Sequence, residues 1–259
     1  MHKRGARLGQ HFLTARWAAV SLTRAPHIRD GETILEIGPG KGMLTRELLA
    51  TGQHVIAIEK DELLVIKLHE TFTAEIARGQ LTIITGDIRD IVPEKVGLVG
   101  GGYVVAANIP YYITGEIIRQ FLTANEQPRA MALLVQKEVA QRVTAKTESI
   151  LSLSVKVYGT PRIIEKVSRK SFSPAPSVDS AILLVDNISR TFFTSIDEAH
   201  FFEVVRTGFA SKRKFLLNNL GVRFDKEAAR AALIHLGIDE KARAETITST
   251  QWGMLAKLL

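Results

Sequence analysis

The chain has 259 residues, of which 46% are hydrophobic and 24% charged, the composition of an ordinary soluble globular protein. This length allows one large domain, or a large domain followed by a small one, and the lack of cysteine excludes disulfides, thiolate zinc sites and a cysteine nucleophile. The formal net charge of +7 favours a nucleic acid or an acidic surface as partner.

No apolar run approaches the ~18 residues that a membrane-spanning helix needs, so we expect no membrane partner. The N-terminus is basic but lacks the apolar stretch of a secretory signal, and we expect the protein in the cytoplasm. The histidines show no metal-ligand spacing, and we predict no metal site. We expect a monomer.

Strand-like and helix-like segments alternate from about residue 32. The patterns predict strands at 33–37, 54–58, 81–85, 103–107 and 130–135, and helices at 43–50, 62–72 and 115–122. This alternation indicates an α/β fold with a mostly parallel, doubly wound sheet. Helical patterns then dominate, at 197–209, 212–220, 225–236 and 249–258. We therefore predict a catalytic domain over residues 1–187 and a small helical C-terminal domain over residues 188–259.

Polar or glycine residues follow four of these strands at their carboxyl ends. They are Gly38, Glu59, Asp87 and Asn108. In an open parallel sheet, ligands bind in the crevice outside the carboxyl ends of the strands. We therefore expect these four residues to lie around one site.

The glycine loop Gly38-x-Gly40-x-Gly42 joins a predicted strand to a predicted helix. Its glycines allow a ligand to approach the backbone, and the helix N-terminus offers free N–H groups to an anion. A dinucleotide fold prefers G-x-G-x-x-G, whereas Met43 stands at the third glycine position here. This spacing favours an amino-acid carboxylate, such as that of S-adenosylmethionine. The alternative is a tight turn that needs positive φ.

Two acidic residues complete the predicted cofactor site. Glu59 lies 21 residues after Gly38, at the spacing of an acidic group that holds ribose hydroxyls. Asp87 is placed to accept a hydrogen bond from an adenine amine. Each could instead lie in a solvated loop or cap a helix, but their shared position at strand ends favours the cofactor.

The run Asn108-Ile109-Pro110-Tyr111 is suited to holding a nucleobase. The Asn108 amide and a neighbouring backbone carbonyl of Ile109 or Pro110 can accept hydrogen bonds from an exocyclic amine. The Tyr111 ring offers a face on which the base can stack. The same run is also an ordinary turn after a strand, so the adjoining cofactor crevice is what favours catalysis.

Positive charge is concentrated in two segments. Residues 1–29 contain no Asp or Glu but include Arg4 and Arg7, and the second segment is Lys212-Arg213-Lys214. Phosphate binding depends on such local clusters. We predict that Arg4, Arg7 and residues 212–214 bind RNA, although a charge run is more commonly a solvated helix face.

Four segments occur in an order similar to that of the ribosomal RNA adenine N6-dimethyltransferases. They are Gly9-Gln10-His11-Phe12-Leu13, Glu36-Ile37-Gly38-Pro39-Gly40-Lys41-Gly42, Asn108-Ile109-Pro110-Tyr111 and Phe172-Ser173-Pro174-Ala175-Pro176-Ser177-Val178-Asp179-Ser180. The resemblance covers nearly the whole chain and implies the Rossmann-like sheet of class I methyltransferases. The family includes a KsgA type, which acts on small-subunit rRNA, and an Erm type, which acts on large-subunit rRNA. Residues 209–220 resemble the KsgA type.

The resemblance implies S-adenosylmethionine as cofactor and dimethylation of two adjacent adenines in the 3′-terminal hairpin of small-subunit rRNA, in a ribosome-assembly intermediate. It implies that His11 and Leu13 border the cofactor, that Asn108 faces both cofactor and target, and that Tyr111 and Phe172 enclose the target adenine. Two segments depart from the family pattern: His11 replaces a frequent Asn, and residues 148–152 replace Tyr-Gly-x-Leu-Ser.

Other functions remain compatible with parts of the pattern. A nucleotide-dependent oxidoreductase has the same fold, but the glycine spacing disfavours it. DNA adenine methylation uses a related motif with two prolines, whereas only Pro110 is present here. An Erm-type enzyme and a non-enzymatic ribosome-assembly factor with a vestigial site are the remaining alternatives.

Overall fold

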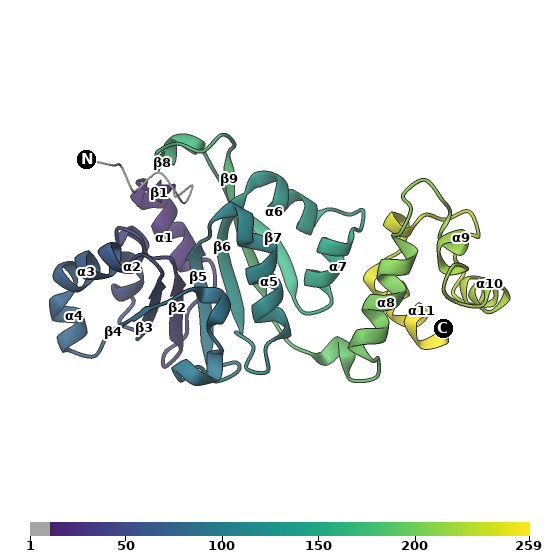
Figure 1. The fold of residues 1–259 in the computed structure, drawn as a ribbon, viewed down its shortest axis with the longest axis horizontal. Helices are drawn as coiled ribbons and strands as arrows, with labels where there is room; N and C mark the ends of the chain where they lie inside the picture. Colours follow the sequence, from purple (N-terminus) through teal and green to yellow (C-terminus); the bar gives the residue numbers. More distant parts are fainter. Residues whose placement is uncertain (1–10) are drawn as a thin grey trace. The chain divides into compact units, whose positions relative to one another are not determined.

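The computed structural model describes residues 11–259 (Figure 1). Arg4 and Arg7, which we predict to bind RNA, lie outside this range. The chain forms two compact units. The first comprises the chain up to Gln141 together with Thr160–Ile188, and the second comprises Arg142–Gly159 and Ser189–Leu259.

The first unit is built on a seven-stranded sheet in the order β4-β3-β2-β5-β6-β9-β7. The central strands are parallel, and β9 is antiparallel to both β6 and β7. The strands are β2 (Thr33–Ile37), β3 (Val55–Glu59), β4 (Leu81–Thr85), β5 (Tyr103–Asn108), β6 (Ala130–Gln136), β7 (Thr160–Val167) and β9 (Ser180–Asp186). Nearly continuous apolar runs suit strands buried on both faces, and the predicted doubly wound α/β fold is confirmed.

Helices pack on the sheet of the first unit. They are α1 (Arg16–Arg24), α2 (Met43–Leu49), α3 (Glu62–Thr71), α4 (Thr73–Ala77), α5 (Thr114–Thr123) and α6 (Lys137–Thr144), the last of which continues into the second unit. Alternate residues of a strand point to opposite faces. Accordingly Ile34 and Val104 join the cluster that contains Ala18 of α1 and Leu48 of α2, all with 4% exposure or less.

Short elements join these helices and strands. A two-stranded ribbon that we did not predict pairs β1 (Phe12–Leu13) with β8 (Phe172–Ser173). Within residues 11–259 the 3₁₀ turns are η2 (Ile88–Asp90), η3 (Pro93–Val96), η4 (Tyr111–Ile113), η5 (Arg169–Ser171), η6 (Thr191–Phe193) and η7 (Ala244–Thr246).

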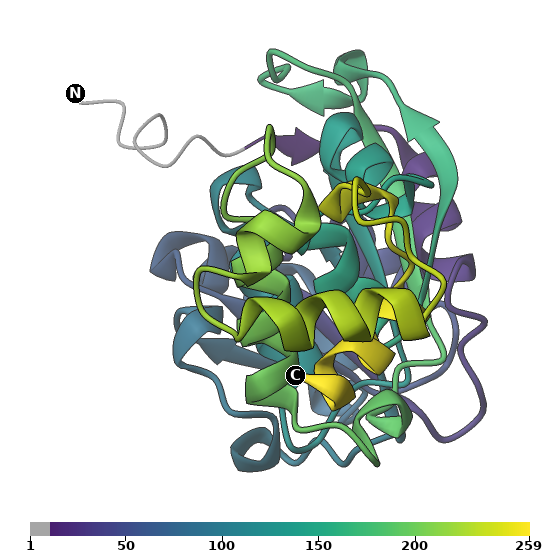
Figure 2. The same cartoon turned by 90° about the vertical axis from the view of Figure 1, so that its right-hand side faces the viewer.

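The second unit is helical (Figure 2). It contains α7 (Ile150–Lys156), α8 (Glu198–Gly208), α9 (Leu216–Leu220), α10 (Lys226–His235) and α11 (Ser249–Leu258). Residues 142–159, which we assign to the first domain from sequence, group with this unit. The Glu148 N–H donates to the carbonyl of Glu245 at 2.8 Å, and the Tyr158 hydroxyl donates to the Glu198 carboxylate at 2.6 Å. The domain limits 1–187 and 188–259 stay a prediction.

The helix predicted over 212–220 is wrong in its first turn, because α9 begins only at Leu216. The side-chain amide of Asn219 donates to the carbonyls of Gly208 at 2.6 Å and Ser211 at 3.0 Å. The Arg243 guanidinium donates to the carbonyl of Lys212 at 3.3 Å. These bonds hold the segment between α8 and α9 in a non-helical path, and residues 212–214 form an exposed loop.

Gly208→Ala is expected to destabilise the second unit by about 1–3 kcal/mol, since a Cβ there would lie 2.4 Å from the ring of the fully buried Trp252. Urea unfolding measures this change. Gly115→Ala on α5 is the matched control, because its Cβ would meet nothing within 4 Å, and it should be neutral or stabilising. Equal stability of both variants would contradict the packing described for Gly208.

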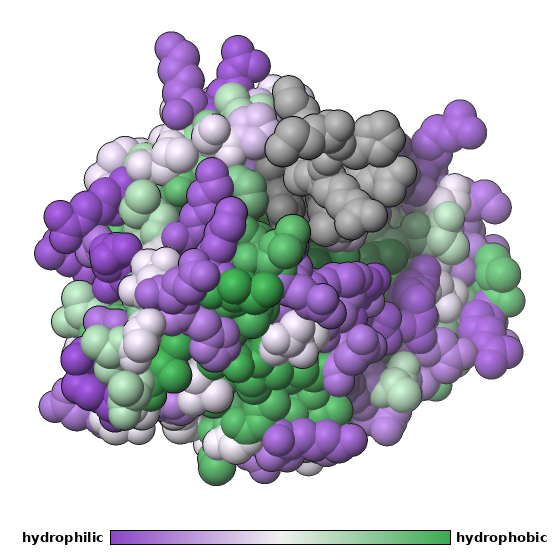
Figure 3. All heavy atoms as spheres, turned by 60° about the vertical axis from the view of Figure 1, so that its left-hand side comes forward, coloured by the Kyte–Doolittle hydropathy of each residue, from purple (hydrophilic) through white to green (hydrophobic). Residues whose placement is uncertain are grey.

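Some large apolar side chains of the first unit remain exposed. Leu63 and Ile66 on α3 are 65% and 55% exposed, and Val99 is 68% exposed. Figure 3 shows apolar surface gathered between charged groups. More than half of a protein's accessible surface is ordinarily apolar, so these residues need no functional explanation.

Candidate active site

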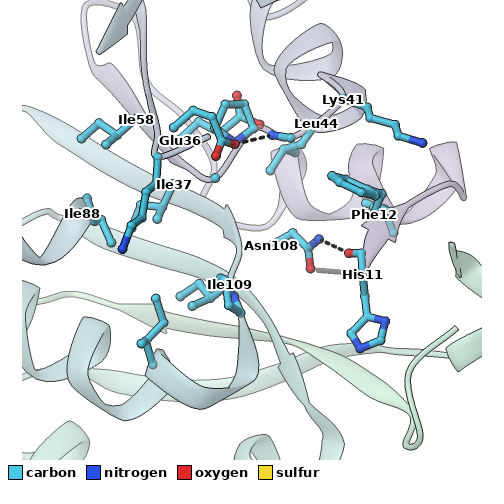
Figure 4. A pocket seen from close by; sticks show the side chains of 18 of the residues that line it. His11, Phe12, Glu36, Ile37, Lys41, Leu44, Ile58, Ile88, Asn108 and Ile109 are labelled. Carbon is cyan, nitrogen blue, oxygen red and sulfur yellow. Dashed lines mark hydrogen bonds between the residues drawn. The ribbon is translucent and has the colours of Figure 1, made fainter. Parts of the chain in front are cut away.

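A pocket lies at the carboxyl ends of β2, β3 and β5, within the first unit (Figure 4). Gly38, Glu59, Asp87 and Asn108 all line it, as their positions after the predicted strands indicate. The structure also brings further predicted residues to its wall, among them His11, Leu13, Ile109, Pro110 and Tyr111. Gly40 lines it as well. Segments that are about 100 residues apart in sequence therefore meet at one site.

The glycine loop has a backbone that only glycine adopts easily. Gly38, Gly40 and Gly42 have φ of 65°, 59° and 77°. A Cβ on Gly40 would lie 3.0 Å from the Phe12 ring, and one on Gly42 would lie 2.6 Å from the Phe72 ring. The loop thus presents bare backbone to the pocket while packing tightly behind it.

Glu59 ties this loop to the start of α3. Its Oε2 accepts the Gly40 N–H at 3.1 Å, and its Oε1 accepts the Asp61 N–H at 3.0 Å. The residue is only 4% exposed. Each carboxylate oxygen retains a lone pair, so Glu59 can also accept hydrogen bonds from a diol in the pocket.

Asp87 is held by two cations. Arg89 contacts both carboxylate oxygens, at 3.0 Å and 2.6 Å, and Lys60 contacts Oδ2 at 2.8 Å. The Arg89 hydrogen bonds, with those of Lys60, hold the pKa of Asp87 far below its ordinary value although burial opposes the shift. A ligand amine must therefore share Asp87 with these cations. Both cations line the pocket, and neither is predictable from the sequence pattern.

Glu36 is a buried carboxyl group that sequence reasoning missed. It is 1% exposed near the carboxyl end of β2 and lines the pocket. Its Oε2 has no hydrogen-bond partner among the described residues. Burial, with a contribution from the charge of Glu59, raises the pKa of Glu36 to about 8. The available signal was an acidic residue inside an apolar strand, directly before the glycine loop.

The Asn108 amide is oriented by the N-terminal segment. Its Nδ2 donates to the backbone carbonyl of His11 at 3.1 Å (Figure 4). Among the described residues no donor reaches Oδ1, so this oxygen is available as an acceptor. Ile109 is 1% exposed, and its burial fixes the backbone that follows Asn108.

Tyr111 is anchored at its hydroxyl group. It shares a 2.7 Å hydrogen bond with Oγ of Ser180, a fully buried residue of β9. Burial raises the pKa of Tyr111. The His11 ring stacks on Tyr111 with centroids 6.0 Å apart, and His11 Nδ1 bonds the carbonyl of Pro174 at 2.7 Å. Ser180 therefore holds the Tyr111 hydroxyl group in place, a contact that pattern reasoning did not identify.

Phe172 is not brought to the pocket wall. It is 4% exposed in the core cluster, and β1 pairs it with Leu13. Its place beside the target base stays a prediction, as does the RNA contact of Lys212-Arg213-Lys214, which lie in the second unit.

Two kinds of feature are absent from the part of the chain that the structure describes. No cluster of three or more His, Asp or Glu residues is placed there to hold a metal ion. No helix within residues 11–259 is both long and apolar enough to cross a membrane.

The comparisons with known proteins agree on one family. Its profile, described as ribosomal RNA adenine dimethylase, matches residues 1–259. The chain is 39% identical over 252 residues to a ribosomal RNA small subunit methyltransferase A of Dehalococcoides mccartyi, covering 96% of this chain and 86% of the relative. It is 36% identical to the protein of the same name in Moorella thermoacetica, covering 97% and 91%.

Solved structures with the same architecture include a dimethyladenosine transferase from Plasmodium falciparum, at 26% identity and a TM-score of 0.79, covering 95% of this chain and 96% of that one. The 23S rRNA methyltransferase ErmE gives 25% identity and a TM-score of 0.78, covering 96% and 99%. Together with the pocket at the strand ends, these matches show that the chain belongs to the ribosomal RNA adenine dimethylase family.

Proposed function

We propose that this protein transfers methyl groups from S-adenosylmethionine to N6 of two adjacent adenines in the 3′-terminal hairpin of small-subunit rRNA. The relatives named small subunit methyltransferase A, at 33–39% identity, support the small subunit as target. The observation that carries the chemistry is the Asn108 amide, whose nitrogen is bound to His11 and whose oxygen is available in the pocket. The protein acts as a cytoplasmic monomer on a small-subunit assembly intermediate.

The pocket fits S-adenosylmethionine. The positive-φ glycines leave backbone N–H groups accessible to a carboxylate, Glu59 has lone pairs for the ribose, and Asp87 can accept from the adenine amine. Glu36 has an unpartnered oxygen in the same pocket, which suits a cationic ligand. His11 and Leu13 border the site. When bound, S-adenosylmethionine supplies an electrophilic methyl group on a positively charged sulfur.

The chain's own residues orient the target amine. The amine lone pair of adenine is delocalised into the ring, which makes the nitrogen a poor nucleophile. Asn108 Oδ1 and the carbonyl of Ile109 or Pro110 accept its two N–H groups, and this favours a pyramidal nitrogen with a localised lone pair. Tyr111 stacks on the base. Catalysis then comes from positioning and fixed dipoles, and the proton leaves after transfer without a strong base.

Labelled methyl transfer to unmethylated small subunits, with mapping of the modified adenines, tests this function. We expect two dimethylated neighbouring adenines in the 3′-terminal hairpin. Unmethylated large subunits are offered in a parallel reaction, and label in their rRNA but not in the small subunits would indicate an Erm-type activity. Binding to small subunits without transfer would indicate an assembly factor.

Glu36 is expected to make cofactor binding pH-dependent. Below about pH 8 the carboxyl is protonated, and a cationic ligand favours its ionised form, so binding at pH 7 should release a proton. Affinity should therefore increase as pH rises toward about 8. Calorimetry in buffers of different ionisation enthalpy measures the release. Glu36→Gln is the control, because the variant has no carboxyl proton to release at position 36. Any proton release by the ligand's own amino group remains in this variant. Equal release by both proteins would contradict the assignment.

Ser180→Ala is expected to reduce kcat/KM for the RNA about 3- to 10-fold. This factor corresponds to the free energy that one neutral hydrogen bond contributes. Tyr111→Phe removes the same bond and should have the same effect. The double variant should lose no more than either single variant, which a double-mutant cycle of steady-state rates measures. Additive losses would mean that Ser180 acts independently of Tyr111.

A further inference from the structure

A second groove lies within the first unit, between helix α1 and strand β7. Trp17 on α1 is 47% exposed and Ile164 on β7 is 39% exposed. Strand β7 is the edge of the sheet, and its register with β9 is interrupted between Ile163 and Glu165, so that Ile164 lies in a bulge. The groove therefore has an indole ring and an aliphatic side chain that the fold leaves partly uncovered.

The charge of this groove is positive. Arg16, Arg24 and Arg162 line it, against the single carboxylate of Glu165. Arg16 contacts Glu47 and Arg162 contacts Asp186, yet their side chains remain 77% and 52% exposed. Glu165 already accepts a hydrogen bond from Ser21 at 2.9 Å. Exposed guanidinium groups around an aromatic ring match a nucleotide, which offers a phosphate and a flat base.

The groove adjoins the candidate active site through the β1–β8 ribbon. Helix α1 begins three residues after Leu13, and β8 begins five residues after β7 ends. Thr14 ties the two connecting segments, because both its N–H and its hydroxyl donate to the Ser171 carbonyl, at 2.8 Å and 3.0 Å. Phe12 and Leu13 of the same ribbon line the pocket. The elements that form the groove are therefore connected directly to the ribbon that lines the pocket.

We propose that this groove binds an unpaired nucleotide segment of the substrate RNA, with one base stacked on Trp17 beside Ile164 and phosphates held by Arg24 and Arg162. The proposal rests on the proposed function, because it assumes an RNA substrate. It adds a second RNA-binding surface, formed by α1 and β7, to the pocket that receives the target adenine.

Trp17 provides a direct readout, since the only other tryptophan, Trp252, is fully buried. The probe is the unmethylated 3′-terminal hairpin of small-subunit rRNA with its flanking single strand, added without cofactor. We expect it to quench the tryptophan emission of the parent protein. Trp17→Ala should raise the Kd about 10-fold, whereas Trp17→Phe should keep the affinity within about 3-fold and lose the quenching.

The arginines are tested by salt dependence. Arg24→Ala combined with Arg162→Ala should make the plot of log Kd against log salt less steep by about 0.7 for each phosphate that the variant no longer neutralises. Ile66→Ala and Lys67→Ala are the controls, because α3 packs on β3 and β4 at the other end of the sheet, and both should leave Kd and slope unchanged. Cofactor affinity of all variants should equal that of the parent.

The outcomes separate the two proposals. The groove proposal would be overturned if saturating RNA left the parent's tryptophan emission unchanged and Trp17→Ala bound the RNA with the affinity of the parent. Methyl transfer by the parent would still support the proposed function in that case. Quenching of the parent's emission, together with weaker RNA binding by Trp17→Ala, would support the groove proposal. If the parent nevertheless transferred no methyl group, only the proposed function would be wrong.

Discussion

Asn108→Ala is expected to reduce methyl transfer to unmethylated small subunits about 10²- to 10³-fold, the typical loss when one preorganised polar group is removed from a reacting centre. In the proposed mechanism the variant loses the acceptor for the target amine. It also loses the bond that holds the His11 carbonyl. Affinity for S-adenosylmethionine should change by less than about 5-fold, because Glu59, Asp87 and the glycine loop remain.

Single-turnover transfer of labelled methyl separates this effect from RNA binding. Asn108→Asp is an informative second variant, since it keeps an acceptor oxygen but has no N–H to donate to His11. Its transfer rate should lie between those of the parent and Asn108→Ala, or below both. Transfer by Asn108→Ala at the parent rate would remove Asn108 from the mechanism and with it the main support for adenine chemistry.

Glu59→Ala is expected to weaken S-adenosylmethionine binding by at least about 10²-fold. Hydrogen bonds to a charged group contribute about 1.5–3 kcal/mol each, and Glu59 can accept from both ribose hydroxyls. The substitution also frees the Gly40 N–H from its 3.1 Å bond, so the glycine loop loses the partner that sets its distance from α3.

Titration calorimetry measures this loss. Glu62→Ala, at a nearby exposed acidic position on α3, should bind like the parent. The rate of methyl transfer by Glu59→Ala should fall by a similar factor at low cofactor concentration and recover at saturating cofactor. This result would show that Glu59 acts through cofactor binding. Unchanged affinity of Glu59→Ala would exclude it from the cofactor site.

The sequence predicted the core of the fold well because the parallel strands are local apolar runs of five to seven residues. Placing Gly38, Glu59, Asp87 and Asn108 at strand ends was then enough to bring them together, since parallel strands end at one edge. The ribbon of β1 with β8 was missed because each strand has two residues, too few to show any alternation.

The parts of the site that could not be predicted depend on long-range pairing. Ser180 meets Tyr111 across 69 positions, and Lys60 meets Asp87 across 27; neither spacing follows a local period. The first turn of the helix predicted over 212–220 was wrong for a related reason. Its residues favour a helix, but Asn219 reaches back to Gly208 and Ser211 and stabilises a loop instead.

The bond between Asn108 and the His11 carbonyl affects how the protein is best prepared. The Asn108 amide is oriented by main chain that directly follows the first ten residues, so an affinity tag or fusion partner placed ahead of them is joined to the segment that orients this amide. A tag after Leu259 is attached to α11 in the helical unit, which holds no residue of the pocket. C-terminally tagged protein is therefore the better reference for every rate comparison above.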